Sequence, residues 1–364
     1  MFHLDADEPS IPSHQLDEDT PPEPTTASGL VIRSTGSWYD VITDDGDAIK
    51  ARIRGRFRLE AIEIDETNPL AVGDRVTLRV DPDGIGLVTD IAPRENQLSR
   101  RAAGRKAAIK EHVMVANVDR VWCIQSTFGP KLNAGFVDRI LVAAEASHIP
   151  AGLVINKIDL LDGNERAQEA IAFWVDLYRQ LGYPVLLTSA DTGDGVEAFR
   201  DALANQTSVV SGPSGVGKSS LLNAIDPELD LRTNEISDKT QKGRHTTTFA
   251  TLHPLAGGWV ADTPGVREWG IWDMAPEELG GYFVEFRPFI PDCRFPDCTH
   301  DHEPGCAVAD AEERGEIAPE RYGSYLQMLE SVRETSKQSK EMRWRTGRRP
   351  DDPDEAEVDL EDDD

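Results

Sequence analysis

The chain has 364 residues, of which 39% are hydrophobic, enough for two or three domains with buried cores. Its net charge is −28, but residues 1–27 hold seven acidic residues, residues 350–364 hold ten, and neither segment contains Lys or Arg. Residues 28–349 therefore carry only −11. The sequence has no apolar run of about 18 residues and no basic-then-apolar leader, which excludes a membrane span and a signal peptide. We expect a cytoplasmic protein with no membrane partner.

The two acidic end segments, 1–27 and 350–364, are too polar to form a core, so we expect them to be disordered tails. They would keep the protein soluble, or adapt it to a salty cytoplasm. Docking to a basic partner is the alternative function for them.

Short β-like runs separated by Gly, Asp and Pro turns follow the first tail, at 29–35, 38–43, 48–58, 74–80 and 84–92. Five strands in so short a segment predict a small OB-type β-barrel for residues 28–95, with an SH3-like barrel as the alternative. In the third run, basic residues recur at every second position, as on one face of a strand, and could bind RNA phosphates: Lys50, Arg52, Arg54, Arg56 and Arg58. Basic segments at 100–110 and 337–349 strengthen the prediction of RNA binding.

Residues 96–269 alternate apolar strands with amphipathic helices, which predicts a mostly parallel α/β sheet. The expected strands are 118–126, 151–156, 184–190, 207–212 and 258–263, and the longest expected helices are 135–149 and 166–182. Cys123 stands alone in the first of these strands.

A glycine-rich loop follows the strand at 207–212 and opens a helix. Its sequence, GPSGVGKSS, fits a P-loop, whose backbone N–H groups face phosphate oxygens at a helix N-terminus. Lys218 would contact the β- and γ-phosphates, and Ser219 would bind Mg²⁺. The candidate binding residues are Gly212, Pro213, Ser214, Gly215, Val216, Gly217, Lys218, Ser219 and Ser220.

The segment ADTPG ends a later strand and completes the phosphate side of the predicted site. Asp262 stands where a Walker-B acid holds Mg²⁺, and Gly265 stands where a backbone N–H meets the γ-phosphate.

The expected strand at 151–156 runs into Asn156-Lys157-Ile158-Asp159, a pattern that reads guanine. Guanine presents two parallel donors, so the Asp159 carboxylate, which accepts two hydrogen bonds at once, is the natural partner. Asn156 would brace the loop and the Lys157 stem would cover the base. Ser189 and Ala190, after the next strand, would form the second wall, with the Ala190 N–H directed at the guanine oxygen.

The base-reading motif precedes the phosphate loop, the reverse of the usual GTPase order, so the domain is predicted to be circularly permuted. This order resembles that of the ribosome small-subunit-dependent GTPase family, RsgA or YjeQ, over about residues 29–345. The resemblance implies an OB barrel, a permuted GTPase domain at 96–269 and a zinc-binding and helical domain at 270–349. It also implies GTP and GDP as ligands, and action on the 30S subunit and its 16S rRNA during late maturation. We expect a monomer.

Val266 stands where Ras-like enzymes place the glutamine that orients water, so intrinsic hydrolysis is expected to be slow. The segment KGRHTTT lies in the position of switch I, where Thr247 or a neighbouring threonine could bind Mg²⁺. His245 could orient the attacking water, as the resemblance favours, or it could be an exposed loop residue. The candidate catalytic residues are therefore His245, Lys218 and Thr247.

Three cysteines and a histidine crowd into fourteen residues, at Cys293, Cys298, His300 and Cys306. Three thiolates and one imidazole suit one structural Zn²⁺. His302 is a rival fourth ligand, and the family pattern favours His300.

We therefore predict a GTPase whose hydrolysis is stimulated by the 30S subunit. A non-enzymatic GTP-dependent RNA-binding switch and a GTPase of another RNA particle are the alternatives.

Overall fold

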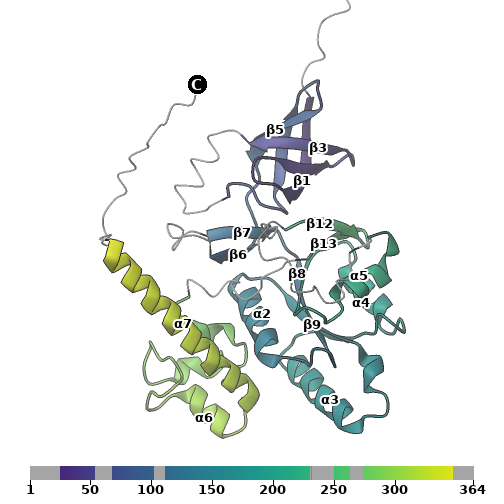
Figure 1. The fold of residues 1–364 in the computed structure, drawn as a ribbon. Helices are drawn as coiled ribbons and strands as arrows, with labels where there is room; N and C mark the ends of the chain where they lie inside the picture. Colours follow the sequence, from purple (N-terminus) through teal and green to yellow (C-terminus); the bar gives the residue numbers. More distant parts are fainter. Residues whose placement is uncertain are drawn as a thin grey trace, which may run out of the picture.

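The computed structural model describes residues 25–53, 68–101, 111–229, 231, 250–262 and 274–346, without the side chains of Arg101, Asp262 and residues 338–346. A β-barrel lies at one end, an α/β sheet in the middle, and a helical part with a long C-terminal helix beside it (Figure 1). Among these residues, no helix combines the length and apolar character needed to span a membrane.

The N-terminal barrel is built from five strands: β1 (Thr25–Ser34), β2 (Tyr39–Thr43), β3 (Ala48–Ile53), β4 (Arg75–Val80) and β5 (Ile85–Ile91). It closes in the order β1-β2-β3-β5-β4, with β3 parallel to β5 and β1 antiparallel to β4. This topology confirms the OB-type barrel over the SH3-like alternative. The first strand starts at Thr25, inside the segment expected to be a tail, because Thr25–Ala27 pair with β4.

The basic residues of β3 alternate as predicted where the structure describes them. Lys50 and Arg52 are exposed on either side of the buried Ala51. The Arg52 guanidinium lies over the Trp38 ring, 3.8 Å from its centroid. The remaining members of the expected stripe, Arg54, Arg56 and Arg58, are outside the described residues.

A two-stranded hairpin, β6 (Gln97–Arg101) and β7 (Glu111–Ala116), lies between the barrel and the central sheet (Figure 1). The sequence did not predict it. The basic segment at 100–110 begins in β6 and then leaves the described residues.

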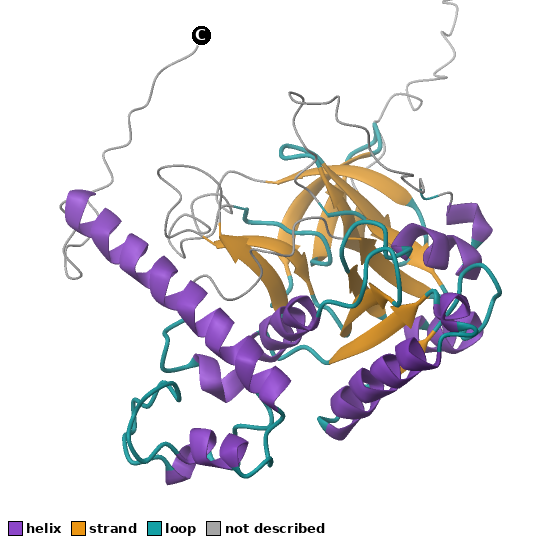
Figure 2. Cartoon of the chain, turned by 60° about the horizontal axis from the view of Figure 1, so that its bottom comes forward, coloured by secondary structure: helices purple, strands orange, loops and turns teal. Residues whose placement is uncertain are grey.

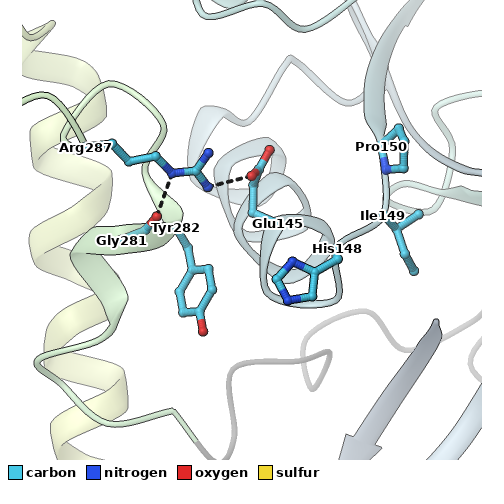
Figure 3. Close-up of a pocket in the computed structure, with 7 residues that line it drawn as sticks. All are labelled: Glu145, His148, Ile149, Pro150, Gly281, Tyr282 and Arg287. Atoms are coloured by element: carbon cyan, nitrogen blue, oxygen red, sulfur yellow. Dashed lines mark hydrogen bonds and ion pairs between the residues drawn. The ribbon is translucent and has the colours of Figure 1, made fainter. Parts of the chain in front are cut away.

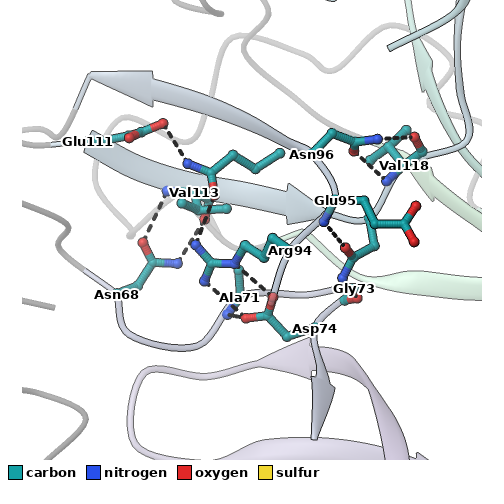
Figure 4. Close-up of polar contacts among 12 residues, drawn as sticks. Asn68, Ala71, Gly73, Asp74, Arg94, Glu95, Asn96, Glu111, Val113 and Val118 are labelled. Carbon is teal, nitrogen blue, oxygen red and sulfur yellow. Dashed lines mark hydrogen bonds and ion pairs between the residues drawn. The ribbon is translucent and has the colours of Figure 1, made fainter. Parts of the chain in front are cut away.

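Polar contacts lock this junction (Figure 4). The fully buried Asp74 carboxylate accepts two hydrogen bonds from Arg94, from Nε at 2.8 Å and from Nη2 at 3.0 Å. Three asparagine side chains add bonds to backbone groups of neighbouring segments: Asn68 with Val113, Asn96 with Val118, and Asn117 with Gly73 and Glu95. The barrel is thereby fixed to the α/β part.

The central sheet has six strands in the order β10-β9-β8-β11-β13-β12, parallel except for β12 at one edge. The strands are β8 (Arg120–Ser126), β9 (Ala151–Asn156), β10 (Val185–Leu187), β11 (Thr207–Ser211), β12 (Leu252–Leu255) and β13 (Gly258–Asp262). The five predicted strands are present, and the short β12 was not predicted.

Helices cover both faces of this sheet. The helices are α2 (Ala134–Ala146), α3 (Glu165–Gln180), α4 (Val196–Leu203) and α5 (Lys218–Ile225), with short turns η1 (Ile158–Leu161) and η2 (Pro227–Leu229). In β8, Val121 and Cys123 pack with α2 and α3, whereas Trp122 and Ile124 pack with α4 and α5. Both faces of β8 are buried, which explains why four consecutive residues of this strand, 121–124, are apolar.

The C-terminal part comprises η4 (Leu279–Tyr282), η5 (Ile290–Asp292), α6 (Ala307–Glu313) and α7 (Pro319–Thr346). Seen from below, the long helix α7 lies beside one helix of the sheet, α2 (Figure 2). Its Arg321 is 1% exposed and donates to Asp138 of α2 at 2.5 Å and to Glu285 at 2.6 Å. Burial alone would lower the pKa of Arg321, but these two carboxylates raise it above its ordinary value.

A hollow of about 600 Å³ lies at the same junction, with Arg287 across its edge (Figure 3). The Arg287 guanidinium donates to Glu145 at 2.6 Å and to the Gly281 carbonyl at 2.8 Å. The lining residues are Glu145, His148, Ile149, Pro150, Gly281, Tyr282 and Arg287. The hollow lies at the C-terminal end of α2, whereas the loop that joins β8 to α2 lies at the other end of this helix.

Candidate nucleotide-binding site and metal site

Three loops meet at the carboxyl edge of the parallel sheet. The base motif follows β9, the glycine-rich loop follows β11, and both strands pair with β8 between them. The Ser189-Ala190 segment follows β10, the neighbour of β9. Ligands bind at this edge in open α/β sheets, so the permuted chain order still brings the predicted parts together.

The glycine-rich loop requires glycine at two positions. A Cβ at Gly212 would lie 2.1 Å from the Ile124 carbonyl oxygen, which is impossible without moving the backbone. Gly217 has φ +92°, and a Cβ there would lie 2.4 Å from Asn156 Nδ2. Ordinary side chains are excluded at both sites, which lets the loop approach the sheet and the base motif closely.

Lys218 begins α5, and its ammonium folds back over the loop. Nζ donates to the carbonyl oxygens of Gly212 at 2.9 Å and Pro213 at 3.3 Å. Ser219 and Ser220 follow in the first turn and are half-buried, while Ser214 and Gly215 at the loop tip are exposed. The loop therefore opens to solvent at the N-terminus of α5, where backbone N–H groups and the helix dipole favour an anion.

Asn156 holds the three loops together and is 1% exposed. Its Nδ2 donates to the Val216 carbonyl in the glycine-rich loop at 3.0 Å. Its Oδ1 accepts from Thr188 Oγ1 at 3.2 Å and from the Ala190 N–H at 3.3 Å. These bonds connect the base motif to the glycine-rich loop and to the segment after β10.

Lys157 adopts a left-handed conformation, with φ 65°. Its Nζ donates to the Gly215 carbonyl at 2.6 Å and to the Gly129 carbonyl at 2.8 Å. The side chain therefore spans from the base motif to the glycine-rich loop and to the loop that follows β8. A base lying along this stem would be covered on one side.

Asp159 lies in the first turn of η1 and is half-buried, like its neighbour Ile158. The Ser189 hydroxyl donates to Asp159 Oδ1 at 2.5 Å. This bond fixes the direction of the carboxylate from the second wall, a role for Ser189 that the sequence did not predict in detail.

The loop at 127–132, between β8 and α2, also reaches this edge and was missed by the sequence reasoning. Ser126 Oγ donates to the Pro130 carbonyl at 2.6 Å, and the Gly129 carbonyl accepts from Lys157. The sequence offered one signal for this loop, its position after an apolar strand of the same parallel sheet, where loops lie at the carboxyl edge.

The remaining predicted residues are only partly placed. The Asp262 backbone ends β13 and pairs with Val210, two residues before the glycine-rich loop. Its side chain is not described, and His245, Thr247, Gly265 and Val266 lie outside the described residues.

The three cysteines and His300 gather into one cluster, with their ligand atoms all within 4.8 Å of one another. The Sγ atoms of Cys293 and Cys306 each lie 3.5 Å from His300 Nδ1. A tetrahedral Zn²⁺ with ordinary Zn–S and Zn–N bonds separates such atoms by about 3.6 Å. The donor set and its spacing therefore fit zinc.

The rival ligand His302 points away from this cluster. Its side chain is 75% exposed, and its Nδ1 lies 3.1 Å from Asp301 Oδ2. By contrast His300 is 2% exposed, and the Tyr322 hydroxyl donates to its carbonyl at 2.7 Å. The fourth cysteine, Cys123, lies in the sheet core, where burial raises the pKa of its thiol to about 12 and keeps it neutral.

Comparison with known families agrees with this arrangement. The RsgA N-terminal domain model matches residues 28–88, and the RsgA GTPase model matches residues 91–272, half of the chain. The chain belongs to the RsgA GTPase family. It is therefore a GTPase, which sets aside the non-enzymatic alternative.

Two curated RsgA relatives are both called "Small ribosomal subunit biogenesis GTPase RsgA". The Bacteroides fragilis protein is 42% identical over 307 residues, covering 84% of this chain and 97% of the relative. The Gemmatimonas aurantiaca protein is 44% identical over 311 residues, covering 85% and 98%.

Solved RsgA-type structures share the fold. YjeQ from Thermotoga maritima superposes with a TM-score of 0.68 at 35% identity, covering 85% of this chain and 99% of that one. YloQ, described as a circularly permuted GTPase, gives 0.65 at 30% identity, covering 85% and 96%. These matches confirm the permuted order inferred from the motifs.

Proposed function

We propose that this RsgA-family GTPase binds the 30S ribosomal subunit, acts in its late maturation, and hydrolyses GTP faster when bound to it. The observation that carries this proposal is the meeting of the base motif and the phosphate loop at one edge of the sheet, in the permuted order of relatives named for small-subunit biogenesis.

In this proposal Asp159 accepts the two donors of guanine, and the Lys157 stem covers the base. The Ala190 N–H would exchange its bond to Asn156 Oδ1 for one to the guanine oxygen. The Ser189–Asp159 bond at 2.5 Å supports the first role, since it directs the carboxylate. Adenine would leave that carboxylate without a donor, at a cost of about 1–3 kcal/mol. The binding residues are those predicted: Asn156, Lys157, Ile158, Asp159, Ser189, Ala190, Gly212–Ser220, Asp262 and Gly265.

The phosphate side would bind Mg²⁺ through Ser219, Asp262 and a switch threonine, with Thr247 our choice. Lys218 would exchange its bonds to the Gly212 and Pro213 carbonyls for phosphate oxygens. His245 would orient the attacking water once the subunit is bound. A bound Mg²⁺ would neutralise charge on the β- and γ-phosphates.

RNA contact would run through the exposed basic residues of β3, with 16S rRNA as the ligand. Lys50 and Arg52 are exposed on this strand, and the Arg52 guanidinium lies over the Trp38 ring, an arrangement that suits contact with phosphates or bases. The zinc cluster would stabilise the C-terminal part. We propose a cytoplasmic monomer, with the basic segments at 100–110 and 337–349 as further contacts.

The test is GTP hydrolysis by the full-length chain, alone and with purified 30S subunits, with 50S subunits as the matched control. We expect 30S subunits to raise the rate by about 10²-fold, a barrier change of roughly 2.7 kcal/mol, and 50S subunits to have no effect. Equal rates with and without 30S subunits would refute the subunit-dependent function and favour the alternative of another RNA particle.

A further inference from the structure

The buried threonine directly after β8 contacts the backbone of the base motif. Thr127 is 5% exposed. Its N–H donates to the Asn156 carbonyl at 3.1 Å, and its Oγ1 donates to the Lys157 carbonyl at 2.6 Å. One residue outside the base motif therefore contacts two consecutive peptide groups within it, the first through its backbone N–H and the second through its side-chain hydroxyl.

The peptide group between Lys157 and Ile158 is held from both sides. Its carbonyl accepts from Thr127, and its N–H, which belongs to Ile158, donates to the Thr188 carbonyl at 3.2 Å. Thr127 follows β8 and Thr188 follows β10, the two neighbours of β9 in the sheet. The peptide plane is thus fixed by the residues that directly follow the two flanking strands.

This peptide plane follows a residue in an unfavourable backbone conformation. Lys157 has φ 65° and ψ 39°, a left-handed region that lysine rarely adopts because its Cβ crowds the following carbonyl oxygen. Such a conformation persists only when surrounding contacts enforce it. The hydroxyl of Thr127 binds that same carbonyl oxygen.

Two ligand-facing groups depend on this conformation. The Lys157 side chain leaves the turn toward the Gly215 and Gly129 carbonyls, and Asp159 lies two residues later in η1. A rotation of the Lys157–Ile158 peptide would move both groups, and with them the wall and the carboxylate of the base site.

We infer that Thr127 is a positioning residue for guanine selectivity: its hydroxyl holds Lys157 in the left-handed turn that aims Asp159 at the base. This inference rests on the proposed role of Asp159 as the base reader. It assigns Thr127 no contact with the nucleotide.

The experiment measures the Kd values of the full-length chain for GDP and IDP, which lacks the exocyclic amine of guanine. Thr127→Val removes the hydroxyl and keeps the shape, so we expect the Kd for GDP to rise about tenfold and the GDP-over-IDP preference to fall by a similar factor. In hydrolysis the loss should appear mainly in KM rather than in kcat. Thr127→Ser, which restores the hydroxyl, should recover most of the preference.

Thr43→Val is the matched control, because Thr43 is 6% exposed, its hydroxyl accepts from the Asp47 N–H at 3.0 Å, and it lies in the barrel. It should leave both Kd values unchanged. If Thr127→Val keeps the wild-type preference, or weakens GDP and IDP equally while lowering the melting temperature, Thr127 is only structural and the inference is wrong.

Asp159→Asn in the same assay separates this inference from the function on which it rests. A lost GDP preference in Asp159→Asn together with an unchanged preference in Thr127→Val would overturn the role of Thr127 alone. An unchanged preference in both variants would overturn the base-reading assignment and, with it, the inference.

Discussion

Arg321 of α7 and Asp138 of α2 form an ion pair at 2.5 Å in which both side chains are 1% exposed. The pair joins the C-terminal part to the helix that follows β8. Asp138 also accepts from the Tyr178 hydroxyl at 2.8 Å, and Arg321 also binds Glu285, so the carboxylates outnumber the guanidinium in this buried group.

Replacement of Arg321 should destabilise the whole chain. Arg321→Ala would leave Asp138 and Glu285 buried without their cation, and we expect a loss of about 3–5 kcal/mol in the free energy of unfolding. Chemical denaturation measures it. Arg314→Ala, which breaks an exposed pair with Glu316, is the control and should leave the unfolding midpoint unchanged. Equal unfolding midpoints for the two variants would show that the buried pair does not stabilise the fold as predicted.

Asp159→Asn should change which nucleotide the protein prefers. The asparagine amide presents a donor to the guanine amine, so GTP affinity should fall by roughly 10²-fold while XTP, which has a carbonyl there, is favoured. Competition binding with GTP and XTP tests this. Asp162→Asn, an exposed acid in the same loop, should keep the GTP preference.

Zinc should copurify with the protein at one ion per chain. Cys298→Ser should lower the zinc content and expose the C-terminal part to protease, because it removes one thiolate from the cluster. Metal analysis and limited proteolysis measure both effects. Cys123→Ala, at the cysteine in the sheet core, should keep its zinc. A stable, metal-free wild-type protein would rule the site out.

His245→Ala should remove stimulation by 30S subunits while GTP-dependent docking survives. Basal turnover should resemble unassisted Ras-like hydrolysis, on the order of 10⁻⁴ to 10⁻² per second. Raising the salt concentration should weaken subunit binding steeply and barely affect basal hydrolysis, since the proposed docking uses phosphate contacts. The measurements are turnover and cosedimentation, with His148→Ala, at an exposed histidine on the opposite edge of the sheet, as the control. Normal stimulation of His245→Ala would remove its catalytic role.

Sequence patterns predicted the elements whose apolar runs end at clear turn or polar residues. The apolar run at 151–156 ends at a polar motif and matches β9 residue for residue. Missed elements carry weak signals. β12 has four residues, including Pro254, and pairs only at an edge, and β6 is largely polar. Their structure comes from tertiary pairing rather than from local preference.

The candidate site likewise has parts that the sequence predicts and parts that only the fold reveals. Residue type and spacing identified the glycine-rich loop and the base motif, because phosphate and guanine require particular side chains. The partner of Lys157 in the loop after β8 is the Gly129 carbonyl, a backbone group that any residue provides. No residue type marks such an acceptor, so only the fold identifies it.

The contact between the barrel and the sheet affects how domain deletions should be interpreted. Leu30 and Ile32 of β1 pack against the core of the α/β part, Val72 pairs with Val115, and Arg33 bridges to Thr251 beside β12. Removing the barrel would uncover apolar residues of the enzyme core and leave strand edges open. A truncated protein that fails to hydrolyse GTP would therefore report lost stability as readily as lost RNA binding, whereas point changes at exposed Lys50 and Arg52 keep the shared core intact.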